Sequence, residues 1–291
     1  MRSVDAATPM IIDLIMGEPV AVETMLDDLA GVRIVYLGEI HTIARHHQLQ
    51  TDILKSLCER EMKPALGMEM FSEEQQTTLD RWLSGKQRIT ELIKQLGKEH
   101  WTNLQDYESL LTSARELGVP VIALNAPDRL VRKVAREGLA GLSPEEQASL
   151  PEGFEQINPL NDKLLRLRLR VHKAFQEKSL DNIVLAQSLR DATMARAVVR
   201  FLDSPGGKDR SMLVVAGSGH LNYGFGIPER VKQRLDLPFR IILASESGEL
   251  VLSEEEQGQM VPIHLTHNDL EFIQKPIADY LHVIPLKEEA Q

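Results

Sequence analysis

The stretch VRIVYLGEIH, residues 32–41, indicates the fold class of this chain. Its first six residues form a largely apolar, β-branched run of the kind that makes a buried strand. The run breaks at Gly38, and Glu39 and His41 follow just before a segment with helical periodicity. The stretch therefore predicts a strand that delivers a carboxylate and an imidazole at its carboxyl end.

The same arrangement occurs again near the other end of the chain, in SMLVVAGSGH at residues 211–220. An apolar run again leads into a Gly-x-x-His sequence, here Gly217 to His220. In open parallel sheets, ligands bind in the crevice beyond the carboxyl ends of the strands. We therefore interpret the two strand–Gly-x-x-His units as two walls of one site.

Strand-like and helix-like segments alternate along most of the chain, which predicts an α/β fold. We expect a three-layer sandwich in which helices cover both faces of a mostly parallel central sheet. A turn is expected at residues 17–19, and Ser72 with Gln75 predicts a capping box. Strands are expected at residues 10–16, 32–38, 65–71, 119–124, 211–217 and 239–244, with further candidate strands at 261–265 and 280–284. Helices are expected at 21–29, 43–61, 73–84 and 88–117, the last with an interruption near 97–103.

Residues 128–202 contain no convincing strand, so we expect a helical insertion there. One α/β domain is expected over residues 1–250, with the tail at 251–291 packing on the same domain. The segment at 253–260 is acidic and predicts a loop.

Composition limits the partners and the compartment. A hydrophobic content of 43% and a charged content of 26% are typical of a soluble globular protein. The net charge of -10 and the lack of a dense basic run argue against a nucleic-acid partner. No apolar run is long enough to span a bilayer, and the single cysteine, Cys58, excludes an internal disulfide. Because Asp5 and Asp13 interrupt any leader core, we expect a cytosolic chain; the alternative is a periplasmic or anchored protein whose leader has been removed.

Four predicted strands end in polar residues, namely Glu39 with His41, Glu69, Asn125 and His220. Glu69 lies in an otherwise apolar run, where an unpaired carboxylate would be costly. We expect Glu39, His41, Glu69 and His220 to share one pocket. Two imidazoles and two carboxylates suit a divalent metal such as Zn, Mn or Fe. The same groups could run metal-free acid–base chemistry, with histidine as the base and glutamate orienting it.

Two further pairs are candidates for this pocket. His46 and His47 fall in the first turn of the helix after His41, where either one faces the pocket or both are exposed. Arg190 and Asp191 fall in the helical insertion. They are either a surface pair or part of a lid that carries an anion-binding guanidinium.

Taken in order, these motifs resemble the ChaN-like haem-binding uptake proteins, relatives of the Tiki proteases, the TraB proteins and the erythromycin esterases. The resemblance covers about residues 10–245 and is carried by GEIH with His46 and His47, MEMF at 68–71 with Gln75, NAP at 125–127, QSLRDATMA at 187–195 and GSGHLNYGFGIP at 217–228. It implies an α/β sandwich with a helical insertion. It also implies haem binding, with a tyrosine as iron ligand, in a homodimer that holds two haems face to face.

Carried over by residue, Glu39, His41, Glu69 and His220 match the polar site of the superfamily, and Arg190 and Asp191 match its helical motif. The best candidate for the haem ligand is Tyr223, which follows the second motif, since a phenolate can ligate ferric haem. Its alternative role is a rim tyrosine with its hydroxyl in water. We expect His46, His47 and Asn125 to be further cofactor-binding residues. Tyr107 and Tyr280 are weaker ligand candidates, and Tyr36 is expected to be buried in its strand.

Two functions therefore remain open. The first is a haem-binding protein of iron uptake or handling; without a Cys-x-x-Cys-His sequence, the haem would not be covalently attached. The second is a hydrolase, an esterase or protease, in which the strand-end groups activate water and Arg190 holds an anion. A haem carrier with one tyrosine ligand has no evident need of four strand-end polar groups, so the hydrolase stays an alternative. An interaction scaffold would leave Glu69 unexplained.

Overall fold

The computed structural model describes residues 10–97, 101, 103–170, 177–246 and 266–284. The chain divides into two compact units, which are described separately below. The first comprises residues 1–125, 194–248 and 276–291, and the second comprises residues 126–193 and 249–275. The expected strand at 261–265 and the acidic segment at 253–260 lie outside the described residues.

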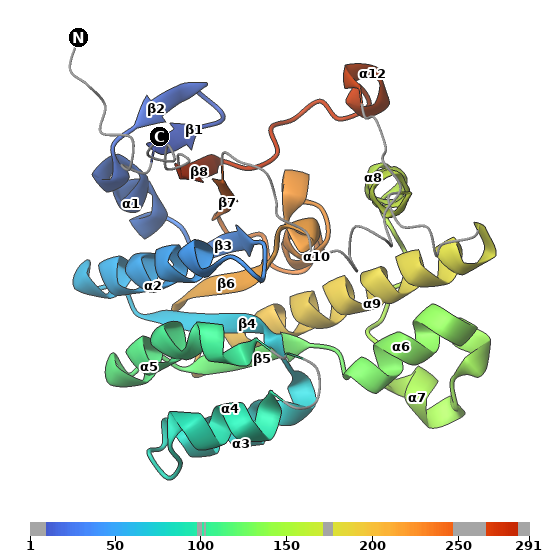
Figure 1. Cartoon of the computed structure of the whole chain (residues 1–291), viewed down its shortest axis with the longest axis horizontal. Helices are drawn as coiled ribbons and strands as arrows, with labels where there is room; N and C mark the ends of the chain where they lie inside the picture. The colour runs from blue at the N-terminus through green and yellow to red at the C-terminus, as the bar shows by residue number, and fades with distance from the viewer. Residues whose placement is uncertain (1–9, 98–100, 102, 171–176, 247–265, 285–291) are drawn as a thin grey trace, which may run out of the picture. The chain divides into compact units, whose positions relative to one another are not determined.

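The first unit is built on an eight-stranded sheet with the strand order β2-β1-β8-β7-β3-β6-β4-β5 (Figure 1). All pairings from β8 to β5 are parallel, whereas β1 is antiparallel to both β8 and β2. The predicted α/β class with a mostly parallel sheet is therefore confirmed. The strands are β1 (Met10–Asp13), β2 (Glu18–Val20), β3 (Ile34–Glu39), β4 (Pro64–Ser72), β5 (Val121–Asn125), β6 (Ser211–Gly217), β7 (Phe239–Glu246) and β8 (Tyr280–Ile284).

Helices pack on both faces of this sheet because successive strand side chains point to opposite faces. Val35 and Leu37 belong to a core cluster with the helices of one face, and Ile34 and Tyr36 belong to a cluster with those of the other. The first face carries α1 (Val22–Ala30), α2 (Ala44–Glu59), α3 (Gln76–Leu83), α4 (Ile89–Leu96) and α5 (Glu108–Glu116). The second carries residues 194–202 of α9 (Glu177–Leu202) and α10 (Ile227–Lys232).

Short 3-10 turns connect several of these elements. The capping box predicted at Ser72 and Gln75 is present, although the segment it caps starts as a 3-10 turn before α3. Two such turns, η4 and η5, follow β6 directly and carry the second Gly-x-x-His motif onward. The turns of the first unit are η1 (Glu73–Gln75), η2 (Leu104–Tyr107), η4 (Ser218–His220) and η5 (Asn222–Gly224).

The described part of the second unit is helical and contains no strand, as expected for residues 128–202. Its elements are α6 (Asp128–Glu137), η3 (Leu139–Gly141), α7 (Pro144–Ser149), α8 (Pro159–Leu169), residues 177–193 of α9, and α12 (His267–Leu270). A separate apolar cluster, which includes Leu130, Val134, Phe154 and Leu189, forms its core. Within the described ranges, no helix of the protein is long and apolar enough to cross a membrane.

The N-terminal hairpin differs from the prediction. Residues 18–20 form β2 instead of ending a turn, and the predicted strand at 10–16 stops at Asp13. The reason is local, because the Asp13 carboxylate accepts the backbone N–H groups of Ile15 and Met16 and closes the turn early. The possible strand at 280–284 is confirmed as β8, and the segment 88–117 is split into α4 and α5 near the expected interruption.

Candidate functional site

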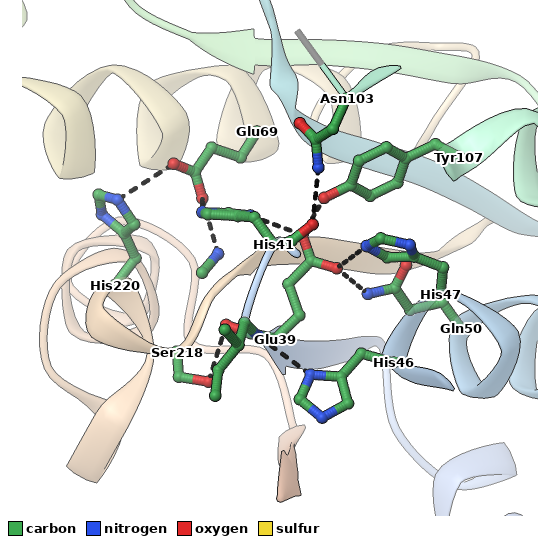
Figure 2. A network of polar contacts seen from close by, with 12 residues as sticks. Glu39, His41, His46, His47, Gln50, Glu69, Asn103, Tyr107, Ser218 and His220 are labelled. Atoms are coloured by element: carbon green, nitrogen blue, oxygen red, sulfur yellow. Dashed lines mark hydrogen bonds and ion pairs between the residues drawn. The ribbon is translucent and has the colours of Figure 1, made fainter. Parts of the chain in front are cut away.

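Three neighbouring strands of the first unit bring the predicted site residues together. In the register of β3 and β6, Glu39 lies opposite Gly217, and β4 pairs with the other edge of β6. Parallel strands end at the same edge of a sheet, so Glu39, Glu69 and the turn after Gly217 meet there. Figure 2 shows the resulting network of contacts around Glu39, His41, Glu69 and His220.

Glu39 is completely buried and contacts four side chains. Its Oε1 atom accepts a hydrogen bond from the Tyr107 hydroxyl at 2.5 Å and lies 2.7 Å from His41 Nδ1. Its Oε2 atom accepts Gln50 Nε2–H at 2.5 Å and lies 3.3 Å from His47 Nε2. Burial alone would raise the pKa of Glu39, but the contacts with His41, His47 and Tyr107 outweigh burial and lower the pKa to about 2. Glu39 is therefore a fixed negative charge at neutral pH.

His41 is the exposed member of the network, with 31% of its side chain accessible. Its Nδ1 atom faces Glu39, and its Nε2 atom lies 3.9 Å from Glu69 Oε2, which is longer than a hydrogen bond. The Trp101 ring packs edge-on against the imidazole, with 4.6 Å between centroids. Asn103 Nδ2 donates to the main-chain oxygen of His41 at 2.7 Å. The ring is thus oriented from one side and accessible on the other.

Glu69 links β4 to the turn that follows β6. Its Oε2 atom accepts the Gly217 N–H at 2.7 Å, and its Oε1 atom lies 3.3 Å from His220 Nε2. Only 1% of the Glu69 side chain is exposed, and His220 is buried as well. Asn125 Nδ2 donates to the main-chain oxygen of Glu69 at 2.9 Å, so this predicted site residue supports the Glu69 backbone.

Gly217 allows these groups to approach one another closely. A Cβ atom at this position would lie 2.8 Å from His41 Nε2 and 3.6 Å from Glu69 Oε2. The first distance is shorter than real Cβ contacts, so a side chain would displace the imidazole. The absence of a side chain at Gly217 therefore allows the His41 ring to pack against the second motif.

Both histidines of the first turn of α2 are buried, so the alternative in which both are exposed is wrong. His47 contacts Glu39, whereas His46 Nδ1 accepts the backbone N–H of Ile40 at 3.0 Å. Burial lowers the pKa of His46 to about 4, which keeps its ring neutral at pH 7. His46 therefore fixes the backbone between Glu39 and His41.

Four residues of the network were not predicted from the sequence, namely Gln50, Trp101, Asn103 and Ser218, whose Oγ donates to the main-chain oxygen of Glu39 at 3.1 Å. Tyr107 was expected only as a weaker ligand candidate, and its hydroxyl instead donates to Glu39. One of them carried a signal. Gln50 precedes Ile53 and Leu54 by three and four positions, so helical periodicity places it on the buried face of its helix. The others come from irregular segments, where no helix or strand periodicity separates buried from exposed positions.

The predicted metal ligands contact one another in pairs. Among the residues that the structure describes, no group of three or more His, Cys, Asp or Glu side chains is arranged to hold a metal ion. Glu39, for example, already contacts four neighbouring side chains. The geometry of this network gives the divalent-metal hypothesis no support.

Tyr223 lies on η5, three residues beyond His220. Its backbone is left-handed, with φ 60° and ψ 17°, and its N–H donates to the main-chain oxygen of Ile277 at 2.7 Å. The side chain is half-buried, with the Phe225 ring 6.2 Å away between centroids. Arg190 and Asp191 lie on α9 in the second unit, where Asp191 is buried; their position beside the site stays a prediction.

Comparisons with known proteins agree with this architecture. A family model described as "Haem-binding uptake, Tiki superfamily, ChaN" matches residues 25–231. The solved structure "Cofacial heme binding to ChaN of Campylobacter jejuni" superposes with a TM-score of 0.70 over 95% of this chain and 96% of that chain, at 19% identity. A mutant of the erythromycin esterase EreC in its open conformation gives a TM-score of 0.49 at 16% identity, over 83% of this chain and 78% of that chain.

One curated relative is similar in sequence. Protein RETICULATA-RELATED 5, chloroplastic, of Arabidopsis thaliana is 27% identical over 276 residues, which cover 87% of this chain. The match spans 37% of the Arabidopsis protein, so the chain corresponds to little more than a third of that relative.

Proposed function

The chain belongs to the ChaN-like haem-binding family of the Tiki superfamily, whose model matches residues 25–231, and from this premise we propose that it binds haem with Tyr223 as the iron ligand. The observation that carries the proposal is that Tyr223 is only partly buried and has a constrained backbone, whereas Tyr36, Tyr107 and Tyr280 are buried. The haem would supply the ferric iron, and this chain would supply the phenolate.

The other three of the four tyrosines are poor ligands, because a phenol must lose its proton to become the phenolate that ligates iron. Tyr36 and Tyr107 are completely buried, and burial raises the pKa of both phenols far above the usual value. Burial and a hydrogen bond to Asp28 raise the pKa of Tyr280 to about 12. Tyr223 is the remaining candidate.

The backbone of Tyr223 supports the same assignment. A bulky residue in the left-handed region costs on the order of 1–3 kcal/mol, and such residues cluster at ligand sites. Among the described non-glycine residues, only Glu61 and Tyr223 have positive φ. The N–H donated to Ile277 holds Tyr223 in this conformation. The turn therefore presents this particular side chain at a conformational cost.

A haemin titration followed by absorbance tests the proposal. The wild-type protein is expected to bind haemin saturably with a high-spin ferric tyrosinate spectrum, and Tyr223→Phe is expected to abolish that spectrum and weaken binding about tenfold or more. Tyr36→Phe is the matched control, because the Tyr36 hydroxyl is buried without a hydrogen-bond partner among the described residues. An unchanged spectrum in Tyr223→Phe, or no saturable binding by the wild type, contradicts the proposal.

Homodimerisation and a role in haem or iron uptake belong to the same proposal. The family description names haem-binding uptake, which supports the uptake role. The homodimer is the arrangement that this chain would need if it shared the cofacial heme binding of the Campylobacter protein. A cofacial pair in a dimer requires one haem per chain and a doubled mass in the loaded state. Light scattering of the haemin-loaded and haem-free protein measures the mass, and the end point of the haemin titration gives the number of haems per chain.

A hydrolase is the second candidate, and the Glu39–His41 pair favours it. An ionised, buried carboxylate orients an accessible imidazole whose Nε2 atom is not hydrogen-bonded to Glu69, as a general base requires. Screening ester and peptide substrates tests the idea, with loss of activity expected in His41→Ala. Activity that survives in both His41→Ala and His220→Ala removes this candidate.

A further inference from the structure

We propose that Glu69 is a positioning residue for haem binding, because it holds in place the turn that carries Tyr223. This turn, residues 217–225, is called the ligand turn below. The inference rests on the proposed function, since it takes Tyr223 as the haem ligand. It also gives a role to a buried carboxylate that a haem carrier does not otherwise need.

Glu69 contacts both ends of the first part of the ligand turn. Its carboxylate accepts the N–H of Gly217 at 2.7 Å and lies 3.3 Å from Nε2 of His220, so η4 is fastened at its start and at its end (Figure 2). The base of this contact is rigid, because β4 is an interior strand that pairs with β5 on one edge and β6 on the other. A carboxylate on such a strand is a fixed point for a loop.

Short backbone hydrogen bonds carry this constraint from His220 to Tyr223. Leu221 N–H donates to Ser218 O at 3.1 Å, Gly224 N–H to Leu221 O at 2.9 Å, and Phe225 N–H to Asn222 O at 3.1 Å. These bonds overlap along the chain, so a shift of His220 moves the residues that follow. A left-handed tyrosine persists only where its surroundings fix it.

Tyr223 is thus restrained by two attachments that come from different parts of the first unit. One is the N–H donated to Ile277 O just before β8, and the other is the chain of contacts through His220 to Glu69 on β4. Loss of the Glu69 attachment removes the contacts that hold Gly217 and His220 on either side of η4. We expect the ligand turn then to sample other conformations, and haem affinity to fall.

Glu73 provides a matched comparison, because it is also a largely buried carboxylate and lies just after β4, with 17% of its side chain accessible. Its side chain pairs with Arg196 at 2.7 Å and with Arg200 at 3.0 Å, neither of which lies in the ligand turn. A change of the Glu73 side chain therefore leaves the contacts of Glu69 with Gly217 and His220 in place.

The experiment compares Glu69→Ala, Glu69→Gln and Glu73→Gln by haemin titration, with circular dichroism to verify folding. Glu69→Ala is expected to weaken haemin binding about tenfold and to reduce the tyrosinate bands. Glu69→Gln keeps an acceptor for Gly217 N–H and is expected to be intermediate, and Glu73→Gln is expected to bind within about twofold of the wild type. Equal losses in Glu69→Gln and Glu73→Gln, or wild-type binding by a folded Glu69→Ala, overturn the inference.

Hydrogen exchange of the haem-free proteins separates this inference from the proposed function. Faster exchange across residues 218–225 is expected in both Glu69 variants and not in Glu73→Gln. If the wild type binds no haemin, the proposed function fails, and exchange still decides whether Glu69 holds the ligand turn. If exchange in the ligand turn is unchanged in the Glu69 variants, the positioning role is wrong whatever the haem result. Should Glu69→Ala not fold, Glu69→Gln and His220→Gln supply the same comparison.

Discussion

The turns after β3 and β6 start from the same sequence pattern, a strand followed by Gly-x-x-His, yet their histidines do different things. In the first turn, His41 pairs with Glu39 of its own motif and leaves 31% of its side chain accessible. In the second, His220 is buried and pairs with Glu69 from another strand. Glu39, which comes from the same segment as His41, orients an accessible imidazole. Glu69, which comes from the strand next to β6, holds the turn that contains His220 in place. The chemistry of the motif therefore depends on the origin of its carboxylate.

The largest expected effect is a loss of stability in acid. It concerns the first turn, because His46 accepts the backbone N–H of Ile40 there. Burial lowers the pKa of His46 from 6.5 to about 4, so the unfolded chain takes up a proton at a higher pH than the folded protein. The stability contributed by neutral His46 is complete above pH 6.5 and is lost as the pH falls toward 4, by about 3 kcal/mol. Glu39, with its pKa lowered from 4.5 to about 2, adds a second loss below pH 4.5.

Urea unfolding at pH 7.5, 5.5 and 4 measures this effect. His46→Asn is the control, because the asparagine Oδ1 atom takes the place of Nδ1 and can still accept the Ile40 N–H while carrying no titratable group. The loss of unfolding free energy between pH 7.5 and pH 5.5, where Glu39 does not yet titrate, is expected to shrink in the variant. An identical pH dependence in both proteins would show that His46 is not the buried group that titrates.

The glycines of the two motifs give the next effect. A Cβ atom at Gly217 meets His41 Nε2 at 2.8 Å, and that ring is fixed by Glu39 and Trp101, so Gly217→Ala is expected to cost about 2 kcal/mol. At Gly38 the nearest atom is Leu243 Cδ2 at 2.4 Å, the far end of a flexible side chain. Gly38→Ala is therefore expected to cost less, about 1 kcal/mol.

Equilibrium unfolding of both alanine variants tests this ranking, with Gly206→Ala as a control. A Cβ atom at Gly206 meets nothing nearer than Ser204 Oγ at 3.9 Å, which is an ordinary contact. If Gly38→Ala lowers the free energy of unfolding more than Gly217→Ala does, the expected difference in packing between the two turns is wrong.

The sequence predicts each motif but not the pairing between them. The strands, the Gly-x-x-His units and the unusual position of Glu69 are local patterns, and they indicate both the fold class and the strand-end site. That Glu69 reaches His220 depends on β4 lying beside β6, an order set by contacts between segments far apart in the chain. The position of β8 between β7 and β1 is likewise set by contacts between segments that are far apart in the chain.

The supporting side chains were harder to predict for a second reason. Tyr107 and Asn103 come from the segment between α4 and α5, where no period of 2 or 3.6 residues separates buried from exposed positions. Only the folded sheet brings Tyr107 to Glu39. Its hydroxyl is nevertheless part of what keeps Glu39 ionised, as the last prediction tests.

An effect smaller than that of Gly217→Ala separates two buried tyrosines, of which only Tyr36 was expected from the sequence to be buried. The Tyr107 hydroxyl donates to Glu39, so Tyr107→Phe removes a hydrogen bond to a buried charge and is expected to cost about 1.5 kcal/mol. It is also expected to raise the pKa of Glu39, because that hydrogen bond helps to lower it. The Tyr36 hydroxyl has no partner among the described residues, so Tyr36→Phe is expected to change stability by less than about 0.5 kcal/mol. Unfolding measured at pH 7 and pH 3 compares the two variants directly. Equal costs for both substitutions would mean that the hydroxyl contact contributes nothing to the Glu39 site, and that Gln50 and the two histidines alone keep the carboxylate ionised.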